Sequence, residues 1–304
     1  MTGYLYIDGH DVYTRFGIGL MKGGHNELVA FPPLKSVNIN DWQEYDGIDP
    51  DLSAPVLDTR TLSIRFGAWH DMEGLGAFIE YLSDGAYHDF YFGLLKRQYR
   101  LRLVSHSDLS WIPRLGFATF KFADDFPFTS DYSVSRMQSD SVSGGDFALD
   151  GRPLTEYGVR VLKGTLASID KSPEVKQNLL RNIKTVPGVE YDPKHVTFKS
   201  KEVQVKCLMR TETAGEFWSR HDALLHDLIK PGLRRLYVRE RDRTYSCYYK
   251  SCKTVEFVPV GRFWWEFTLT FVFTDYRPRG RRAGLRFVSG DSLRLMQDSN
   301  IRLT

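Results

Sequence analysis

A short run near the end of the chain matches a motif of serine-hydrolase chemistry. Gly290-Asp291-Ser292-Leu293 is a phrase in which the serine acts as the nucleophile and a downstream Asp-x-x-His supplies the base. In such enzymes the serine stands near the start of the domain. Here 11 residues follow Leu293, and none of them is a histidine. We therefore interpret the run as a polar turn, and a hydrolase centred on Ser292 is kept only as an alternative.

The histidines and cysteines do not form a metal-binding pattern. The chain has 8 histidines, and none belongs to a His-x-x-x-His or His-Glu-x-x-His pair. His221 and His226 are five positions apart in a predicted helix, which places them on different sides of it. Cys247 and Cys252 are also five apart, on a predicted strand, so we expect them to point to opposite faces. The sequence therefore predicts no metal site and no bound cofactor.

Carboxylates and tryptophans offer two further kinds of site. Asp124-Asp125 and Asp275 could act as general acids or bases, but they stand at strand exits shortly before a proline, which favours turn chemistry. The 6 tryptophans could line a sugar-binding face or lie in cores and interfaces. Trp264 and Trp265 are neighbours on a predicted strand and point to opposite faces. We therefore expect at least one of them to be exposed or at an interface.

The segments that carry these residues occur twice in the same order. Each copy begins with a hydrophobic-Asp-Gly phrase and continues through a glycine 45 positions before an alternating strand. Each closes on an aromatic strand whose exit holds an Asp and a Pro. The matching residues are Ile7-Asp8-Gly9 with Leu149-Asp150-Gly151, Gly17 with Gly158, Leu62 with Val203, and Asp124 with Asp275. Agreement in order, spacing and residue type predicts a duplicated module, and a duplicated module without a catalytic set indicates a building block.

Each predicted module is mostly antiparallel β with one amphipathic helix. Alternation of apolar and polar residues predicts the strands, and apolar residues at i, i+3, i+4 and i+7 predict the helices. The strands are expected at 62–66, 89–92, 98–104, 203–207, 233–239, 244–250 and 267–273, and the helices over 72–82 and 216–229. Segments 24–58 and 165–199 read as long loops, which in a compact domain usually have a task or a partner.

These elements predict an α+β fold that is mainly antiparallel β, with two tandem β-sandwich modules and one flanking α-helix in each. Module 1 spans residues 1–128 and module 2 spans 146–278. Residues 129–145 are rich in Ser, Asp and Gly and are predicted to be a linker or long loop. Residues 279–304 belong to neither copy and begin as a basic C-terminal arm.

The composition excludes several classes of protein. The chain has 304 residues with 41 basic and 38 acidic side chains, a balance that argues against a dedicated nucleic-acid binder. It has no apolar run of 18 residues or more, and its N-terminus lacks the pattern of a secretory signal. With 3 cysteines, a disulfide scaffold is not expected, and synthesis in a cytoplasm is the better interpretation.

The order of elements resembles the tail-tube fold of bacteriophages, and most of all the N-terminal ring-forming domain of siphophage distal tail proteins. The resemblance rests on the Ile7-Asp8-Gly9 strand, the charged loop Asp41–Gly47, the helix from Leu75 to Leu82 and the Asp124–Phe128 exit. It covers module 1 and, more weakly, module 2. Distal tail proteins usually continue into a different C-terminal domain. Because the module recurs here, the chain is also similar to tandem-module baseplate hub and tail-tube proteins.

The resemblance implies tube-type modules and a structural, non-enzymatic role in a phage tail. The expected assembly is a closed ring around the tail channel, either a hexamer or a pseudo-sixfold trimer. The expected partners are copies of the chain and other tail proteins (tube, hub and tape measure), with DNA only passing through the channel and no membrane. The expected location is the virion, after synthesis in the host cytoplasm.

The candidate interface residues lie in the divergent loops, on the last strand and in the basic arm. They are Trp42, Tyr45, Asp46, Tyr191, Asp192, Trp264, Arg279, Arg281, Arg282 and Arg286. An alternative from another class is a carbohydrate-binding tandem β-sandwich adhesin, which predicts exposed Trp or Tyr side chains.

Overall fold

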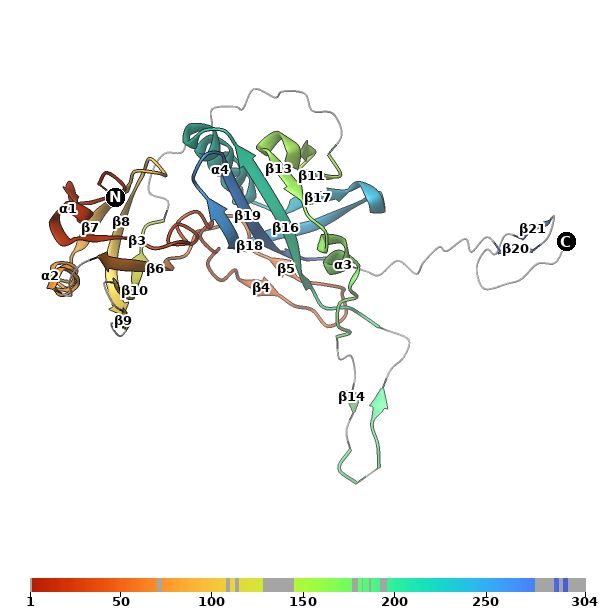
Figure 1. Cartoon of the computed structure of the whole chain (residues 1–304). Helices are drawn as coiled ribbons and strands as arrows, with labels where there is room; N and C mark the ends of the chain where they lie inside the picture. The colour runs from red at the N-terminus through yellow and green to blue at the C-terminus, as the bar shows by residue number, and fades with distance from the viewer. Residues whose placement is uncertain are drawn as a thin grey trace.

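The computed structural model shows a chain built mainly from antiparallel β-sheet, which confirms the fold class expected from the sequence. Two large sheets dominate it (Figure 1), and each is accompanied by one long helix. We call residues 2–127 the first half and 145–276 the second half. The structure describes residues 2–69, 73–107, 110–112, 115–127, 145–176, 180–181, 183–185, 187–191, 196–276, 287–289 and 292–294.

The first sheet has the strand order β2-β1-β7-β8-β10-β6-β3, with β9 paired to β10. Its strands are β1 (Leu5–Ile7), β2 (His10–Asp11), β3 (Ile18–Leu20), β6 (Arg60–Trp69), β7 (Tyr87–Phe92), β8 (Arg97–His106), β9 (Ser110–Ile112) and β10 (Leu115–Asp124). Buried and exposed residues alternate without exception along β7. The sheet therefore has one apolar face, as the sequence pattern predicts.

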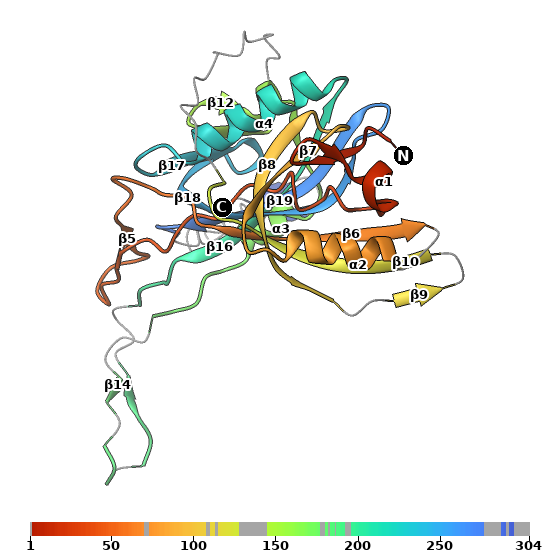
Figure 2. The ribbon, with the colours of Figure 1, turned by 90° about the vertical axis from the view of Figure 1, so that its left-hand side faces the viewer.

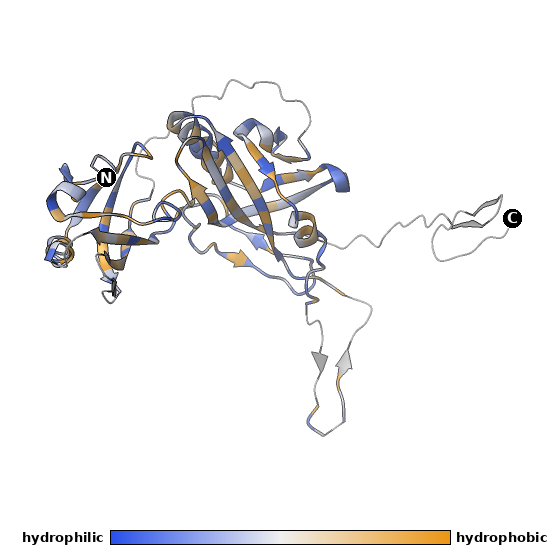
Figure 3. Ribbon diagram, in the orientation of Figure 1, coloured by the Kyte–Doolittle hydropathy of each residue, from blue (hydrophilic) through white to orange (hydrophobic). Residues whose placement is uncertain are grey.

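The second sheet has the order β12-β11-β17-β18-β19-β16-β13. Its strands are β11 (Phe147–Leu149), β12 (Arg152–Pro153), β13 (Val159–Val161), β16 (Lys201–Thr211), β17 (Arg234–Val238), β18 (Arg243–Val258) and β19 (Phe263–Phe273). Each strand holds the position of its counterpart in the first sheet. Along β19 the apolar residues alternate with polar ones (Figure 3), and Phe267, Leu269, Phe271 and Phe273 are buried together.

The first turn of each half has the same unusual backbone. Asp8 and Gly9 have φ angles of 49° and 80°, and Asp150 and Gly151 have 50° and 84°. This left-handed pair makes a tight hairpin turn, which Asp-Gly adopts readily. In both turns the aspartate then accepts a backbone hydrogen bond from the neighbouring strand, at 2.8 Å from Asp89 N and 2.8 Å from Arg235 N. One aspartate therefore shapes the turn and also fixes its strand to the sheet.

Helices α2 (Glu73–Leu82) and α4 (Ala214–Leu228) cover the apolar faces of the two sheets. The ring centroid of Phe78 on α2 lies 5.3 Å from Phe66 and 5.4 Å from Phe120. The predicted start of the second helix at 216 is two residues late, because Thr213 caps it by accepting from Glu216 N. Four shorter turns complete the helical part of the described residues: α1 (Val12–Phe16), η1 (Leu154–Tyr157), α3 (Thr165–Asp170) and η2 (Arg239–Arg241).

A β-bulge in β18 makes one sequence prediction wrong. Cys247 pairs with Phe273 and Cys252 pairs with Leu269, so the two cysteines share a face instead of pointing to opposite faces. The register shifts between Tyr249 and Ser251, and the extra residue restores the parity that a five-residue separation would break.

The two long loops contain short elements of their own. Within 24–58, β4 (Ile39–Asn40) pairs with β5 (Asp49–Pro50), and within 165–199, β14 (Leu180–Arg181) pairs with β15 (Glu190–Tyr191). An isolated bridge closes each loop at a corresponding place, Leu34 with Leu57 and Val175 with Phe198. Both ribbon views show the β14–β15 pair standing away from the large sheets (Figure 2).

The 24–58 segment leaves the first half and packs on the second. On the helix side, the Phe31 ring lies 4.5 Å from His221 and 5.2 Å from Trp265. At the β18 edge, Leu34 N donates to Lys250 O at 2.9 Å. On the outer face, Leu52 joins Tyr248 and Val272 in a separate apolar cluster. Because the segment contacts both faces of the second sheet, the two halves share a core.

Parts of the outer strand edges are already hydrogen-bonded by side chains. On β16, Lys206 N donates to Thr165 Oγ1 at 3.0 Å and Gln204 N donates to Ser168 Oγ at 2.9 Å. On β6, Ser63 N donates to the Glu27 carboxylate. These side chains cover backbone groups that an added strand would need. Contacts with another subunit at these edges would therefore be made by side chains and loops.

The predicted module boundaries stay predictions. Most of the predicted linker and the link between Tyr276 and β20 (Phe287–Ser289) lie outside the described residues, and β20 pairs with β21 (Ser292–Arg294). Of the helices in the described part of the chain, none is both long and apolar enough to cross a bilayer.

Candidate assembly surface

The most exposed tryptophan and tyrosine among the described residues stand close together in the sequence. Trp42 is 60% exposed and Tyr45 is 71% exposed, both on the turn between β4 and β5. We call residues 41–48 the aromatic tip. Large aromatic side chains in water mark a surface that gains free energy when it is covered.

A buried lysine from the second half holds the aromatic tip in place. The Lys176 side chain is only 2% exposed. Its Nζ donates to Trp42 O at 2.8 Å and to Gly47 O at 2.6 Å, and it forms an ion pair with Asp41 at 2.5 Å. All three oxygen partners of this buried ammonium belong to the tip. Moving the tip away would leave the charge of Lys176 buried without them, so the lysine fixes the tip in place.

Backbone contacts complete the attachment. Gly47 N donates to Phe198 O at 2.7 Å, and Phe198 N donates to Asp46 Oδ1 at 2.9 Å. Ile48 N donates to Thr274 O at 2.9 Å, beside the end of β19. The structure therefore divides the predicted tip residues: Trp42 and Tyr45 face solvent, whereas the Asp46 carboxylate is bonded within the chain.

Trp264 lies on a different part of the molecule. Its ring is half-buried, and the Arg210 guanidinium lies 3.9 Å from the ring centroid. Its neighbour Trp265 is fully buried, so the two side chains take opposite faces as the strand pattern predicts. Trp264 stands near the start of β19, at the opposite end from the aromatic tip.

The other predicted interface residues are placed only in part. The backbone of Tyr191 lies in β15, and nothing further is described for its side chain. Asp192, Arg279, Arg281, Arg282 and Arg286 lie outside the described residues. The Ser292 backbone is in β21, and its side chain is likewise outside the description. Their roles stay predictions.

The carboxylates at the end of β10 are engaged in structure. Asp124 is 5% exposed and forms an ion pair with Arg60 at 2.8 Å. Asp125 accepts from Tyr87 OH at 2.7 Å and from Arg102 at 3.0 Å. These contacts tie the strand exit to the neighbouring strands. No group of three or more His, Cys, Asp and Glu residues suited to a metal ion is found among the residues that the structure describes.

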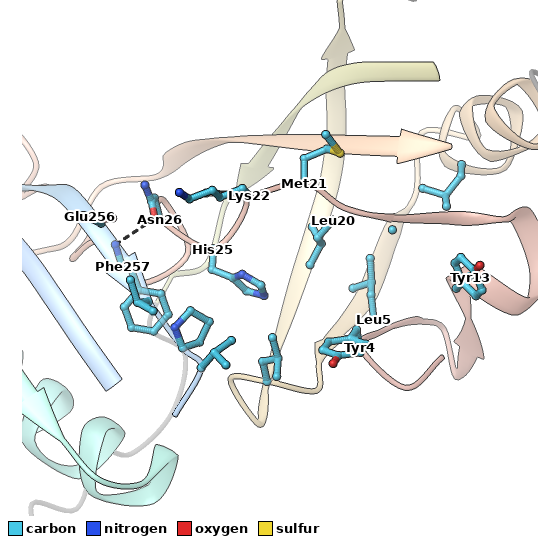
Figure 4. Close-up of a pocket in the computed structure, with 17 residues that line it drawn as sticks. Tyr4, Leu5, Tyr13, Leu20, Met21, Lys22, His25, Asn26, Glu256 and Phe257 are labelled. Carbon is cyan, nitrogen blue, oxygen red and sulfur yellow. Dashed lines mark hydrogen bonds between the residues drawn. The ribbon is translucent and has the colours of Figure 1, made fainter. Parts of the chain in front are cut away.

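A cavity of about 730 Å³ lies where the end of the first sheet meets the β18–β19 turn (Figure 4). We call it the β3 pocket. Its walls include Tyr13 and Leu20 from the first half and Phe257 and Val260 from the second. Sequence reasoning missed it because its walls come from segments more than two hundred residues apart. These segments are short and mix apolar with polar residues, so no local sequence pattern marks the pocket.

His25 stands inside the β3 pocket. Its ring lies between Phe257 and Leu5 in the close-up view (Figure 4), and its buried Nε2 has no hydrogen-bond partner among the described residues. Burial lowers the pKa of His25 from 6.5 to about 4, because a charged imidazole would lose its hydration there. At neutral pH the pocket therefore contains a neutral imidazole with one unmatched nitrogen.

We expect this burial to make the stability of the chain depend on pH. The unfolded chain binds a proton at His25 below pH 6.5 and the folded chain binds it only near pH 4. The contribution of His25 to the free energy of unfolding is therefore complete above pH 6.5, decreases as the pH falls, and is lost by about pH 4. The change in unfolding free energy is up to about 3 kcal/mol. Urea unfolding of the native chain and His25→Phe between pH 7 and pH 4 measures it. Parallel curves for the two proteins would contradict the assignment.

No protein-family model matches the chain, and no curated protein matches it. Among solved structures, the chain is similar to the SPP1 Dit (gp 19.1) protein, described as a paradigm of the hub adsorption apparatus in phages that infect Gram-positive bacteria. The match covers 89% of this chain and 98% of that one, at 10% identity and a TM-score of 0.32. Similarity this low establishes neither a shared fold nor a shared function.

Proposed function

We propose that the chain is a non-enzymatic structural subunit of a bacteriophage tail. It assembles into a closed ring around the tail channel, at the distal or baseplate end of the tube. Its partners are other copies of itself and neighbouring tail proteins, and its location is the virion. A tail-tube or baseplate hub protein that forms a pseudo-sixfold trimer is the nearest variant of this proposal.

The observation that carries the proposal is the matching strand order of the two large sheets. Together with the matching Asp-Gly turns it supports a module copied in place. A chain with two like modules presents similar surfaces twice, and repeated head-to-tail contacts close into a ring when the rotation per module divides a full turn. The covered edges of β6 and β16 favour contacts through loops such as the aromatic tip.

Native mass spectrometry and negative-stain imaging of the purified full chain test the proposal. We expect oligomers whose number of modules is a multiple of six, seen as annuli with a central hole. A chain that stays monomeric at high concentration, alone and with its neighbouring tail proteins added, would remove the basis for a ring.

We expect deletion of residues 279–304 to weaken assembly without unfolding either half. The predicted arm is basic at its start and belongs to neither sequence copy, and the core cluster of the described residues ends at Tyr276, so removal of the arm leaves that core complete. The measurements are the oligomer distribution and the unfolding temperature of the truncated chain. Unchanged assembly would assign the ring contacts wholly to the two halves.

A carbohydrate-binding adhesin is the second candidate, and the solvent-facing Trp42 and Tyr45 favour it. Sugar rings stack on exposed aromatic faces, and the Lys176 attachment would hold those faces still. This candidate requires the monomer to bind glycans and to lose binding in Trp42→Ala. If the chain forms rings and binds nothing on a glycan array, the adhesin candidate is contradicted and the structural role is retained.

A further inference from the structure

The β3 pocket has the properties of a receptor for one aromatic side chain with a polar end. It is about 730 Å³ in volume, within the range of pockets that hold small ligands, and apolar side chains make most of its wall. The Nε2 of His25, whose residue lines the pocket, is unmatched and buried, and a rotation of the ring would present it to a group in the pocket. A neutral imidazole nitrogen either donates or accepts, and a phenol hydroxyl can match both forms. The pocket chemistry therefore fits a tyrosine.

The aromatic tip supplies such a group on the same chain. Tyr45 has a free-standing ring that is 71% exposed, and Trp42 beside it is 60% exposed. The hydrogen bonds of Lys176 hold the tip backbone, so the two rings would lose little backbone freedom on binding.

The charges of the two surfaces are complementary. Residues 41–51 contain five carboxylates and no lysine or arginine, and one of the five, Asp41, is paired with Lys176. Among the pocket's lining residues and those within two positions of them, four side chains are basic (Arg15, Lys22, Lys96 and Arg262) and three are acidic (Asp11, Glu27 and Glu256). An acidic tip approaching this rim gains from opposite charges, which favours a defined orientation.

A chain cannot place its own tip in its own pocket. The tip is bonded to Thr274, just after β19, whereas the pocket residues Phe257 and Val258 pair with Trp265 and Trp264 near the start of that strand. The ten residue steps between these points span about 34 Å at the rise of an extended strand. A β3 pocket that receives this tip would therefore belong to another copy, and the same contact repeated from copy to copy would run head to tail.

We propose that the aromatic tip of one copy inserts into the β3 pocket of the next, with the Tyr45 hydroxyl hydrogen-bonded to His25 Nε2 and Trp42 packed on the apolar rim. This inference rests on the proposed ring assembly and names the contact that builds it.

Photo-crosslinking tests where Tyr45 goes. The full chain carries a photoreactive benzoylphenylalanine in place of Tyr45, and a second version carries it in place of Phe126, which is 61% exposed outside the tip. We expect intermolecular crosslinks from position 45 to residues 18–26 or 256–260. Intermolecular crosslinks from position 45 to other residues would contradict this contact but not the ring assembly. If neither position gives crosslinked oligomers at high concentration, both the proposed contact and the proposed ring assembly are contradicted.

Matched substitutions test the pocket. Val260 lines it and is 69% exposed, whereas Val255 is 54% exposed and is not part of its wall. Both accept a charge without disturbing the core. We expect Val260→Asp to weaken association at least about tenfold, as Tyr45→Ala does, and Val255→Asp to leave it unchanged. An equal mixture of Val260→Asp and Tyr45→Ala chains should form heterodimers through the one intact tip and pocket. Equal effects of the two valine changes, or no heterodimers, would overturn the proposal.

Discussion

Gly47→Ala should detach the aromatic tip from the second half and destabilise the chain by about 3 kcal/mol or more. Gly47 has a φ of 74°, and a Cβ there would lie 1.6 Å from Thr274 O and 2.7 Å from Thr274 C. Both neighbours are backbone atoms, so no side chain can rotate away. The tip must therefore move and lose its hydrogen bonds to Phe198 and Thr274. Urea unfolding measures the loss, and amide exchange at Ile48 reports the detachment.

Gly85→Ala is the matched control for this change. Gly85 has a nearly equal φ of 78°, and a Cβ there would meet nothing within 4 Å. The alanine at position 85 therefore introduces only the strain of a left-handed backbone, which costs about 1 kcal/mol. The difference between the two variants isolates the close approach of Gly47 to Thr274. Equal losses of unfolding free energy would show that this approach is looser than described.

Lys176→Met should release the same tip by removing the group that holds it. The substitution keeps the length of the side chain and removes the ammonium, so the carbonyls of Trp42 and Gly47 lose their donor. One of these acceptors is buried and the other is part-buried, and leaving both without a partner costs about 3 kcal/mol at most. We expect faster amide exchange at Gly47 and a change in the fluorescence of Trp42. Association should fall as well, because the aromatic tip would no longer be rigid.

Lys199→Met provides the control for charge removal in the same region. Lys199 forms an ion pair with Glu174 at 2.9 Å, and both side chains are more than half exposed. An exposed pair of this kind contributes little to stability because water and salt screen it. If Lys199→Met and Lys176→Met had the same effect, the burial of Lys176 would not be what fixes the tip.

The sequence pattern was sufficient for the elements whose causes are local. Alternation at Leu62–Phe66 and Val203–Cys207 identified strands that the structure extends at both ends. The stripe of Leu75, Phe78 and Leu82 identified a helix whose three residues are fully buried. These predictions succeeded because strand and helix periodicity follow from which side chains must avoid water.

The features that were missed depend on contacts between distant residues. Lys176 has the sequence neighbourhood of a surface lysine, and only the packing of the 24–58 segment buries it. The β18 bulge changes the face of Cys252 without a signal in the residues around it. The candidate site was therefore predicted in part: Trp42 and Tyr45 are exposed as an interface requires, whereas the inward role of Asp46 and the β3 pocket needed the three-dimensional arrangement.

The passage of residues 24–58 across the second sheet has a consequence for the peptide connection between the halves. Phe31, Leu34, Leu52 and the tip already attach the first half through both faces of its neighbour, so the covalent link contributes mainly local concentration. A protease nick between residues 129 and 145 should yield two fragments that remain together on a sizing column. The two halves, co-expressed as separate polypeptides, should associate into a complex of the same size as the intact chain.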